Sequence, residues 1–255
     1  MADFSNYPFP TYIPNRLIAG LFSSLLFLSF IFWCIQSIQT RCQPVRLVIL
    51  LLVSHVAIFS ELMIRATMNR TEIQSKIIYI IMTALYTIGQ RSIIVANFTC
   101  ILQHPTAKFR CCFRIISACI LFSDIFMIPA GLLAVQSNKI HLSFIFRQVS
   151  TSMICLILLV FYIVWFWTKT IYSMSFELIV LLIISSLNCL IIAFFLLIMS
   201  IPKYYILIND DEEWFYFFQL LPIALSLIAW SMLHPKRSLF DTADQSDEIT
   251  VSYSF

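Results

Sequence analysis

Seven long apolar stretches are the feature that most constrains the fold of this 255-residue chain. A helix needs about 20 mostly apolar residues to cross the hydrocarbon core of a bilayer, and each stretch is long enough to do so. The sequence therefore predicts an all-α fold, a polytopic membrane protein built as a bundle of seven transmembrane helices. The predicted helices are Leu17–Ile38, Val45–Met68, Ile77–Leu102, Cys112–Val135, Thr151–Thr168, Ser175–Met199 and Trp214–Met232.

The composition excludes the other broad classes of protein. Charged residues make up 11% of the chain and apolar residues 60%, whereas soluble domains carry about 25% and 45–50%. A surface with so little charge excludes an ordinary soluble enzyme, a disordered chain and a nucleic-acid binder. The longest segments between the stretches, Gln136–Ser150 and Ser200–Glu213, are too short for a soluble domain and are expected to be loops. We expect residues 1–16 to be an extracellular segment, residues 17–232 the transmembrane domain, and residues 233–255 a disordered cytosolic tail.

The distribution of basic residues predicts the orientation of the bundle, because cytoplasmic loops of membrane proteins are enriched in Lys and Arg. With the N-terminus outside, eight basic residues lie in inner segments and six in outer ones. The outer six are Arg16, Arg70, Lys76, Lys139, Arg147 and Lys203. The basic segment Lys108–Arg114 and the glycosylation sequon Asn69–Thr71 favour the same orientation. We therefore expect an extracellular N-terminus and a location in the plasma membrane.

Ionisable residues inside the predicted helices are the candidate functional residues, since such groups are costly in a bilayer and commonly face the bundle interior or a cavity. Glu61 and Arg65, about 10 and 5 Å from the outer end of their helix, are four residues apart and can pair on one helical face. Arg91 and Asp124 lie at depths of about 20 and 16 Å, which allows them to pair if the third and fourth helices touch.

Other polar residues extend this set towards the outer surface. Asn188 lies at about the depth of Asp124, and Gln219 lies about 8 Å below the top of the last helix. The acidic run that includes Glu212 and Glu213 stands just before that helix. Such a series of acidic and amide groups would attract a cationic amino headgroup while its tail stayed in lipid. The alternative is that the buried groups only hold helices together, and that the acidic run is a solvated helix N-terminus.

Catalytic and metal-binding motifs are absent from the sequence. It contains no His-Glu-x-x-His, no paired-Asp motif and no glycine-rich phosphate loop, and it has 3 glycines in all. We therefore expect a protein that is not an enzyme, with no catalytic, cofactor-binding or metal-binding residues and no cofactor. The expected partners are membrane lipids or amphiphiles, with no nucleic acid, and the oligomeric state is left open.

Several short motifs follow one another along the chain in a recognisable order. The clearest is the segment Glu212–Gln219, followed at the end of the last helix by His234-Pro235. The others are Tyr12–Asn15, Glu61, Tyr86 with Arg91, and Phe122–Asp124. In this order they resemble the fungal lipid-translocating exporters, a seven-helix family that includes aminocholesterol-resistance proteins and exporters of sphingoid long-chain bases. The chain departs from the family at Gln219, where an Asp is usual, and it lacks the family's Arg-x-x-aromatic-Arg segment in the sixth helix.

The resemblance implies a protein that moves a lipid or amphiphile across the plasma membrane or controls its distribution between the two leaflets, with a sphingoid long-chain base as the expected substrate. The alternative is a seven-transmembrane receptor-like sensor of a lipid or small hydrophobic ligand, which suits the same orientation. The sequence lacks the Asn-Pro-x-x-Tyr motif and the outer cysteine pair of rhodopsin-type receptors. A membrane protein with a purely structural role is the third reading.

Overall fold

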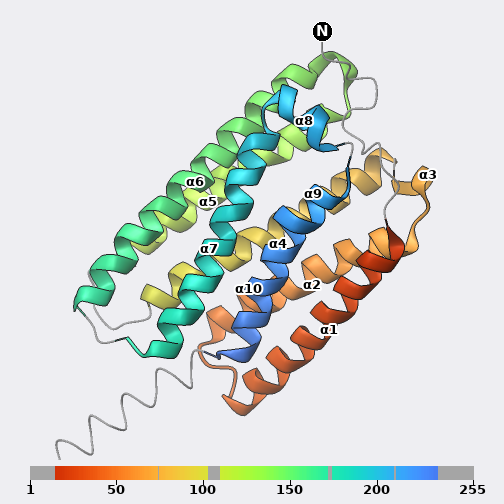
Figure 1. Ribbon diagram of the computed structural model, residues 1–255. Coiled ribbons are helices and arrows are strands. Elements are labelled where there is room, and N and C mark those ends of the chain that lie inside the picture. Colours follow the sequence, from red (N-terminus) through yellow and green to blue (C-terminus); the bar gives the residue numbers. More distant parts are fainter. Residues whose placement is uncertain (1–14, 74, 103–109, 172–173, 210, 235–255) are drawn as a thin grey trace, which may run out of the picture.

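The computed structural model describes residues 15–73, 75–102, 110–171, 174–209 and 211–234, and these residues form an all-helical bundle (Figure 1). The long helices are α1 (Arg16–Gln39), α2 (Val45–Thr67), α4 (Lys76–Leu102), α5 (Arg110–Ala134), α6 (Ile140–Ile171) and α7 (Phe176–Met199), with a last span over Glu213–Met232. Within these described ranges, seven helices are long and apolar enough to cross a membrane. The predicted fold class is therefore confirmed, and the chain is an integral membrane protein.

Short elements gather at one end of the bundle, which we call the α3–α8 end. They are α3 (Arg70–Ile73), η2 (Ser137–Lys139), α8 (Pro202–Asn209) and α9 (Glu213–Phe215). The last span starts there with α9, passes through the π-helical turn η3 (Tyr216–Leu220), and continues as α10 (Leu221–Met232). Pro222 has no N–H to donate to the carbonyl of Phe218, and the turn just before it is the π-helical one.

The long helices form a closed ring with one helix displaced towards its centre. Along the ring, α1 packs on α2, α2 on α4, α4 on α5, α5 on α6, α6 on α7, α7 on α10, and α10 again on α1. Helix α4 also contacts α6, α7 and α10, so it runs through the middle of the bundle (Figure 1). Side chains of α4 are therefore in position to line a cavity inside the bundle.

The outer surface of the bundle is apolar in the way that a lipid-facing surface requires. Large apolar side chains point outwards from every part of the ring, among them Leu17, Phe32, Leu121, Trp167 and Phe176, which are 60–80% exposed. A water-soluble protein rarely leaves so much apolar area uncovered. Hydrocarbon chains cover it at no cost, while the helices satisfy their own backbone groups.

A close approach between α2 and α4 depends on a glycine. The hydroxyl of Ser54 donates a hydrogen bond to the backbone carbonyl of Gly89 at 2.8 Å. A Cβ atom added at Gly89 would lie 2.5 Å from Cδ1 of Ile58, which is fully buried. The two helices can therefore pack at this separation because residue 89 has no side chain.

The prediction that Gln136–Ser150 is a loop is wrong. Only the turn around η2 connects α5 to α6, and α6 begins at Ile140 and runs for 32 residues. The polar residues that made the segment look like a loop are satisfied by neighbouring helices. The hydroxyl of Ser143 donates to the carbonyl of Ala130 at 2.7 Å, and the hydroxyls of Ser123 and Ser150 lie 3.0 Å apart. The predicted loop Ser200–Glu213 is likewise partly helical, because it contains α8.

Candidate functional site

A cavity of about 170 Å³ lies inside the α3–α8 half of the bundle. We call it the charged cavity, after its polar lining residues, which include Glu61, Arg65, Tyr79, Tyr86, Gln90, Arg91, Arg147, Tyr205, Asp211 and Gln219. Apolar lining comes from Ile73, Met82, Met127, Leu196, Met199, Ile208 and Phe215. Three arginines and two carboxylates thus share one space with methionines and other apolar groups, a mixture suited to the polar end of an amphiphile.

Helix α4 contributes one continuous face to this cavity. Its lining residues include Thr83, Tyr86, Thr87, Gln90 and Arg91, and residues three or four apart lie on the same side of a helix. This face points into the cavity because α4 occupies the middle of the bundle. Because α4 has this polar face, its mean hydropathy is the lowest among the first six spans.

The Glu61–Arg65 pair predicted from its i,i+4 spacing is present in α2. The guanidinium of Arg65 donates to one carboxylate oxygen of Glu61, whose side chain is buried. The guanidinium carbon of Arg65 also lies 3.9 Å from the ring centroid of Phe215, which is a cation–π distance. Arg65 therefore links α2 to the start of the last span across the cavity.

Arg91 and Asp124 also meet, as their depths in the sequence predict. Arg91 Nε lies 3.3 Å from Asp124 Oδ1, and Arg91 Nη2 donates to the Ser150 hydroxyl at 3.4 Å. Arg91 lines the cavity, whereas Asp124 holds it from α5 and is not a lining residue. The pair thus joins α4, α5 and α6 while one edge of the guanidinium faces the cavity.

Arg147 is the main residue that sequence reasoning missed. The sequence interpretation placed it in an outer loop, but it lies in α6, donates to the hydroxyl of Tyr79 and faces the ring of Tyr205 at 5.8 Å. A signal for it was present: Ser143, Arg147 and Thr151 are spaced every four residues, the repeat of one helix face. Gln90, Tyr79 and Tyr205 were missed as well, because nothing local marks them as neighbours.

Glu61, Tyr86, Gln90 and Arg91 each contribute to the cavity lining a buried polar atom that has no hydrogen-bond partner in the described structure, namely Oε2, OH, Nε2 and Nη1. Their residues are all at least nine-tenths buried, with Glu61 and Gln90 each 1% exposed. A buried polar atom without a partner costs about 1–3 kcal/mol, more if the group is charged. Four such atoms around one cavity indicate that the space is built to hold a polar partner.

The remaining predicted site residues lie outside the cavity lining, apart from Gln219. Gln219 lines the cavity from η3, and its side-chain nitrogen lies 3.9 Å from Met199 Sδ. Glu212 accepts from the backbone N–H of Asn15 at 2.7 Å and from the Tyr216 hydroxyl at 2.8 Å, so it ties the start of α1 to the last span. Glu213 is exposed, and Asn188 is buried in α7 away from the lining. Of the two aspartates that begin the acidic run, Asp211 lines the cavity and Asp210 is outside the described residues.

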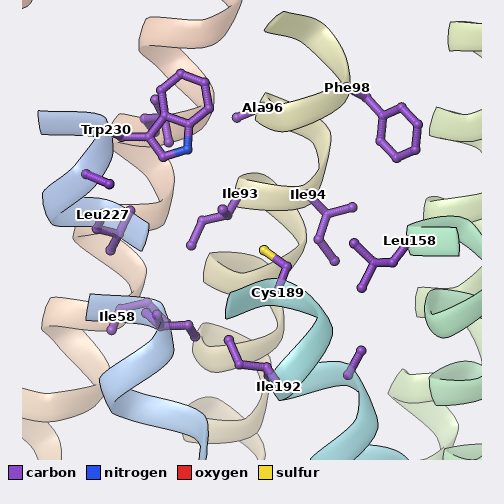
Figure 2. Packing of buried hydrophobic residues seen from close by; sticks show 14 of the residues in the cluster. Ile58, Ile93, Ile94, Ala96, Phe98, Leu158, Cys189, Ile192, Leu227 and Trp230 are labelled. Atoms are coloured by element: carbon purple, nitrogen blue, oxygen red, sulfur yellow. The ribbon is translucent and has the colours of Figure 1, made fainter. Parts of the chain in front are cut away.

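A layer of apolar side chains lies just beyond the cavity, on the side away from the α3–α8 end. Figure 2 shows Ile58, Ile93, Ile94, Ile192 and Leu227 packed together from α2, α4, α7 and α10. All five are fully buried. In α2, α4 and α7, these residues come within about one turn of the deepest cavity residue, on the side away from the α3–α8 end. On these three helices, apolar side chains therefore separate the charged cavity from the other end of the bundle.

Beyond this layer, polar side chains satisfy one another in two groups that we call the serine clusters. In the first, the Ser29 hydroxyl lies 3.1 Å from His55 Nε2 and 2.8 Å from the Ser231 hydroxyl, joining α1, α2 and α10. In the second, the Ser185 hydroxyl donates to Asn97 Oδ1 at 2.8 Å and accepts from Trp230 Nε1 at 3.0 Å, joining α7, α4 and α10. These contacts hold helices together inside the membrane.

Comparison with models of known families, with curated proteins and with solved structures gives no match for this chain. Among the residues that the structure describes, no group of three or more His, Cys, Asp or Glu side chains is placed to hold a metal ion. The function is therefore inferred from the chemistry of the charged cavity.

Proposed function

We propose that the protein binds the polar headgroup of a membrane amphiphile in the charged cavity and moves that amphiphile across the bilayer or controls its distribution between the leaflets. The observation that carries this proposal is the set of four unpartnered buried atoms, from Glu61, Tyr86, Gln90 and Arg91, around a single cavity. A polar ligand that bonded to them would remove their desolvation cost. A sphingoid long-chain base, the substrate class of the exporters that the sequence resembles, offers an amine and hydroxyl groups for these atoms.

We place the charged cavity at the extracellular face of the plasma membrane. The placement follows from the N-out orientation, since α1 starts and α2 ends at the α3–α8 end. The position of Arg147 inside α6 adds support, because it leaves the outer segments with one basic residue fewer than a loop assignment gives them. A protease added to intact cells should cleave an N-terminal tag and spare a C-terminal one. The reverse pattern would place the cavity on the cytosolic side.

A reconstituted transport assay tests the proposal. Purified protein in liposomes should accelerate the movement of a fluorescently tagged long-chain base between leaflets, measured with a membrane-impermeant quencher. Gln90→Met, which removes an unpartnered donor and keeps the side-chain length, should slow this movement about tenfold. Ser226→Ala is the matched control, since Ser226 is buried in α10 outside the lining and its hydroxyl bonds to the Pro222 carbonyl of its own helix. No acceleration by the wild-type protein with any tagged lipid would contradict transport.

A second candidate, a receptor-like sensor, is favoured by the apolar layer beyond the cavity. Ile58, Ile93 and Ile192 are fully buried just beyond the deepest cavity residues of their helices, so a headgroup that moved further along α2, α4 and α7 would meet apolar side chains. For a translocator, α2, α4 and α7 would have to separate at this layer during transport. A sensor would transmit occupancy through a smaller rearrangement of the same helices.

Cross-linking across the layer separates these two candidates. Ile93 of α4 and Ile192 of α7 belong to the same apolar cluster on two helices that contact each other. In a variant without the native cysteines, a Cys pair at these positions is the pair to bridge with a short thiol cross-linker. If the protein is a translocator, the cross-link should stop lipid movement while binding persists. If cross-linking leaves lipid movement unchanged, an opening of this layer is not part of transport.

A further inference from the structure

We propose that the headgroup bound in the charged cavity carries both an ammonium group and an oxyanion, such as a phosphate or carboxylate. This inference rests on the proposed binding of an amphiphile headgroup, and it narrows the ligand class from an amine with hydroxyl groups to a headgroup that carries both charges. It follows from the chemistry of the four unpartnered atoms, which are not of one kind. One is an oxygen of a carboxylate, two are N–H donors, and one is a phenol that can donate or accept.

The acceptor side of the site is Glu61. One of its carboxylate oxygens accepts from Arg65, and the other, Oε2, is buried and left without a partner in the described structure. A carboxylate oxygen can only accept a hydrogen bond, so its partner must bring a proton donor. An ammonium group supplies that donor together with the opposite charge, and hydrogen bonds between such ions are the strong ones.

The donor side of the site lies on α4. Gln90 Nε2 and Arg91 Nη1 are N–H donors on neighbouring residues of α4, and both residues line the cavity. Asp124 and Ser150 already occupy other edges of the Arg91 guanidinium, so Nη1 is the edge left for a ligand. Two donors in the lining of one cavity, one of them charged, fit an oxyanion, which has several oxygen lone pairs to accept from them.

Tyr86 is one helical turn from Gln90 on the face of α4 that lines the cavity, and it shares this lining with Glu61 and Arg91. Its hydroxyl can turn to either half of a headgroup. The lining arginines and carboxylates are also mixed around the whole cavity rather than of one sign. A headgroup with both charges matches this arrangement, whereas an amine or a phosphate alone leaves half of the site unpartnered.

Ligands with one tail and different headgroups test the inference. Thermal-shift titrations of the purified protein in an uncharged maltoside detergent give an apparent affinity for each compound. We expect O-dodecyl phosphoethanolamine to bind at least about tenfold more tightly than dodecylamine or dodecyl phosphate, since each of these makes only half of the charge-assisted bonds. Phosphoethanolamine without the tail distinguishes a soluble zwitterion from an amphiphile.

Two variants assign the halves of the headgroup. Glu61→Gln keeps an oxygen for Arg65 and should weaken the binding of the two ammonium compounds about tenfold, with dodecyl phosphate unchanged. Gln90→Met removes a donor that has no partner in the described structure, and should weaken the binding of the two phosphates several-fold and leave dodecylamine unchanged. Ser226→Ala is the control for both.

The outcomes separate this inference from the proposed function. If dodecylamine binds as tightly as the zwitterion, or if Gln90→Met weakens dodecylamine equally, the oxyanion half is wrong while the binding of an amphiphile stands. If the tail-less compound binds as tightly as its dodecyl form, the headgroup chemistry stands and the amphiphile assignment is overturned. If none of the compounds binds, both proposals fail.

Discussion

The charged cavity and the serine clusters use similar side chains for different purposes. In the clusters, hydroxyls and a histidine from three helices satisfy one another, as at Ser29, His55 and Ser231. In the cavity, Tyr86, Gln90 and one oxygen of Glu61 are buried to the same degree but lack partners within the described residues. The difference teaches that intramembrane polarity alone does not mark a site. A site is marked by polar groups that the helices leave unsatisfied around a space.

The largest expected effect on stability comes from breaking the ion pair that borders the cavity. Asp124→Ala leaves Arg91 as a buried cation without its carboxylate and should lower the free energy of unfolding by about 3 kcal/mol. The double change Arg91→Ala with Asp124→Ala should cost less than Asp124→Ala alone. The measurement is the fraction of folded, monodisperse protein after heating in detergent. Additive effects of the two single changes would show that the pair is not coupled.

The next largest effect on stability is expected at the boundary between the charged cavity and the serine clusters. Gly89→Ala places a methyl group against Ile58, whose side chain is held in the apolar layer, and should cost about 1–3 kcal/mol by overpacking. Gly20→Ala is the matched control, because a Cβ there meets nothing within 4 Å. The two variants are compared by thermal unfolding. Equal stability of both would mean that α2 and α4 are not as closely packed as described.

Within the serine clusters, removing one hydroxyl should destabilise the bundle. Ser185→Ala takes the partner from both Asn97 Oδ1 and Trp230 Nε1, and should lower stability by about 1–2 kcal/mol. Ligand binding at the charged cavity should be unchanged once the protein is folded, since Ser185 is not a lining residue. A loss of binding at full stability would break the distinction between the two regions.

The smallest expected effect on stability is the most informative one. Removing a hydroxyl should destabilise the bundle at Ser185, whereas removing one at Tyr86 should not. Tyr86→Phe removes a buried hydroxyl that has no partner among the described residues, and should leave stability unchanged or raise it by up to about 1 kcal/mol. Binding of the amphiphile should fall several-fold in the same variant. Destabilisation comparable to that of Ser185→Ala would show that the Tyr86 hydroxyl is part of the packing and not of a binding site.

The parts of this structure that the sequence predicts are those fixed by length, hydropathy and local spacing. The seven spans are predicted by apolar runs that are long enough to cross a bilayer. The Glu61–Arg65 pair is predicted by the four-residue spacing that puts both side chains on one face of a helix. The Arg91–Asp124 pair follows from depth, given that α4 and α5 are neighbours.

The parts that the sequence leaves open depend on contacts between distant residues. The start of α6 is set by hydrogen bonds such as Ser143 to Ala130, and these exist only once α5 and α6 have packed. The same packing turns Arg147 from an expected loop charge into a cavity residue. The sequence does not show that Glu212 is bound to Asn15 and Tyr216, or that Glu61 keeps one carboxylate oxygen without a partner in the described structure.

The length of α6 relates the protein to the thickness of its membrane. Its 32 residues correspond to about 48 Å of helix, whereas the hydrocarbon core is about 30 Å thick. A helix with such an excess either tilts or projects into the headgroup region, and the amount depends on the bilayer. Arg147 lies in the first turns of α6, so tilt and projection set how far the charged cavity stands from the lipid phosphates. In thick, sterol-rich membranes the cavity would be drawn towards the acyl chains, and in thin ones it would be lifted towards water, so the surrounding lipid would itself tune access to the site.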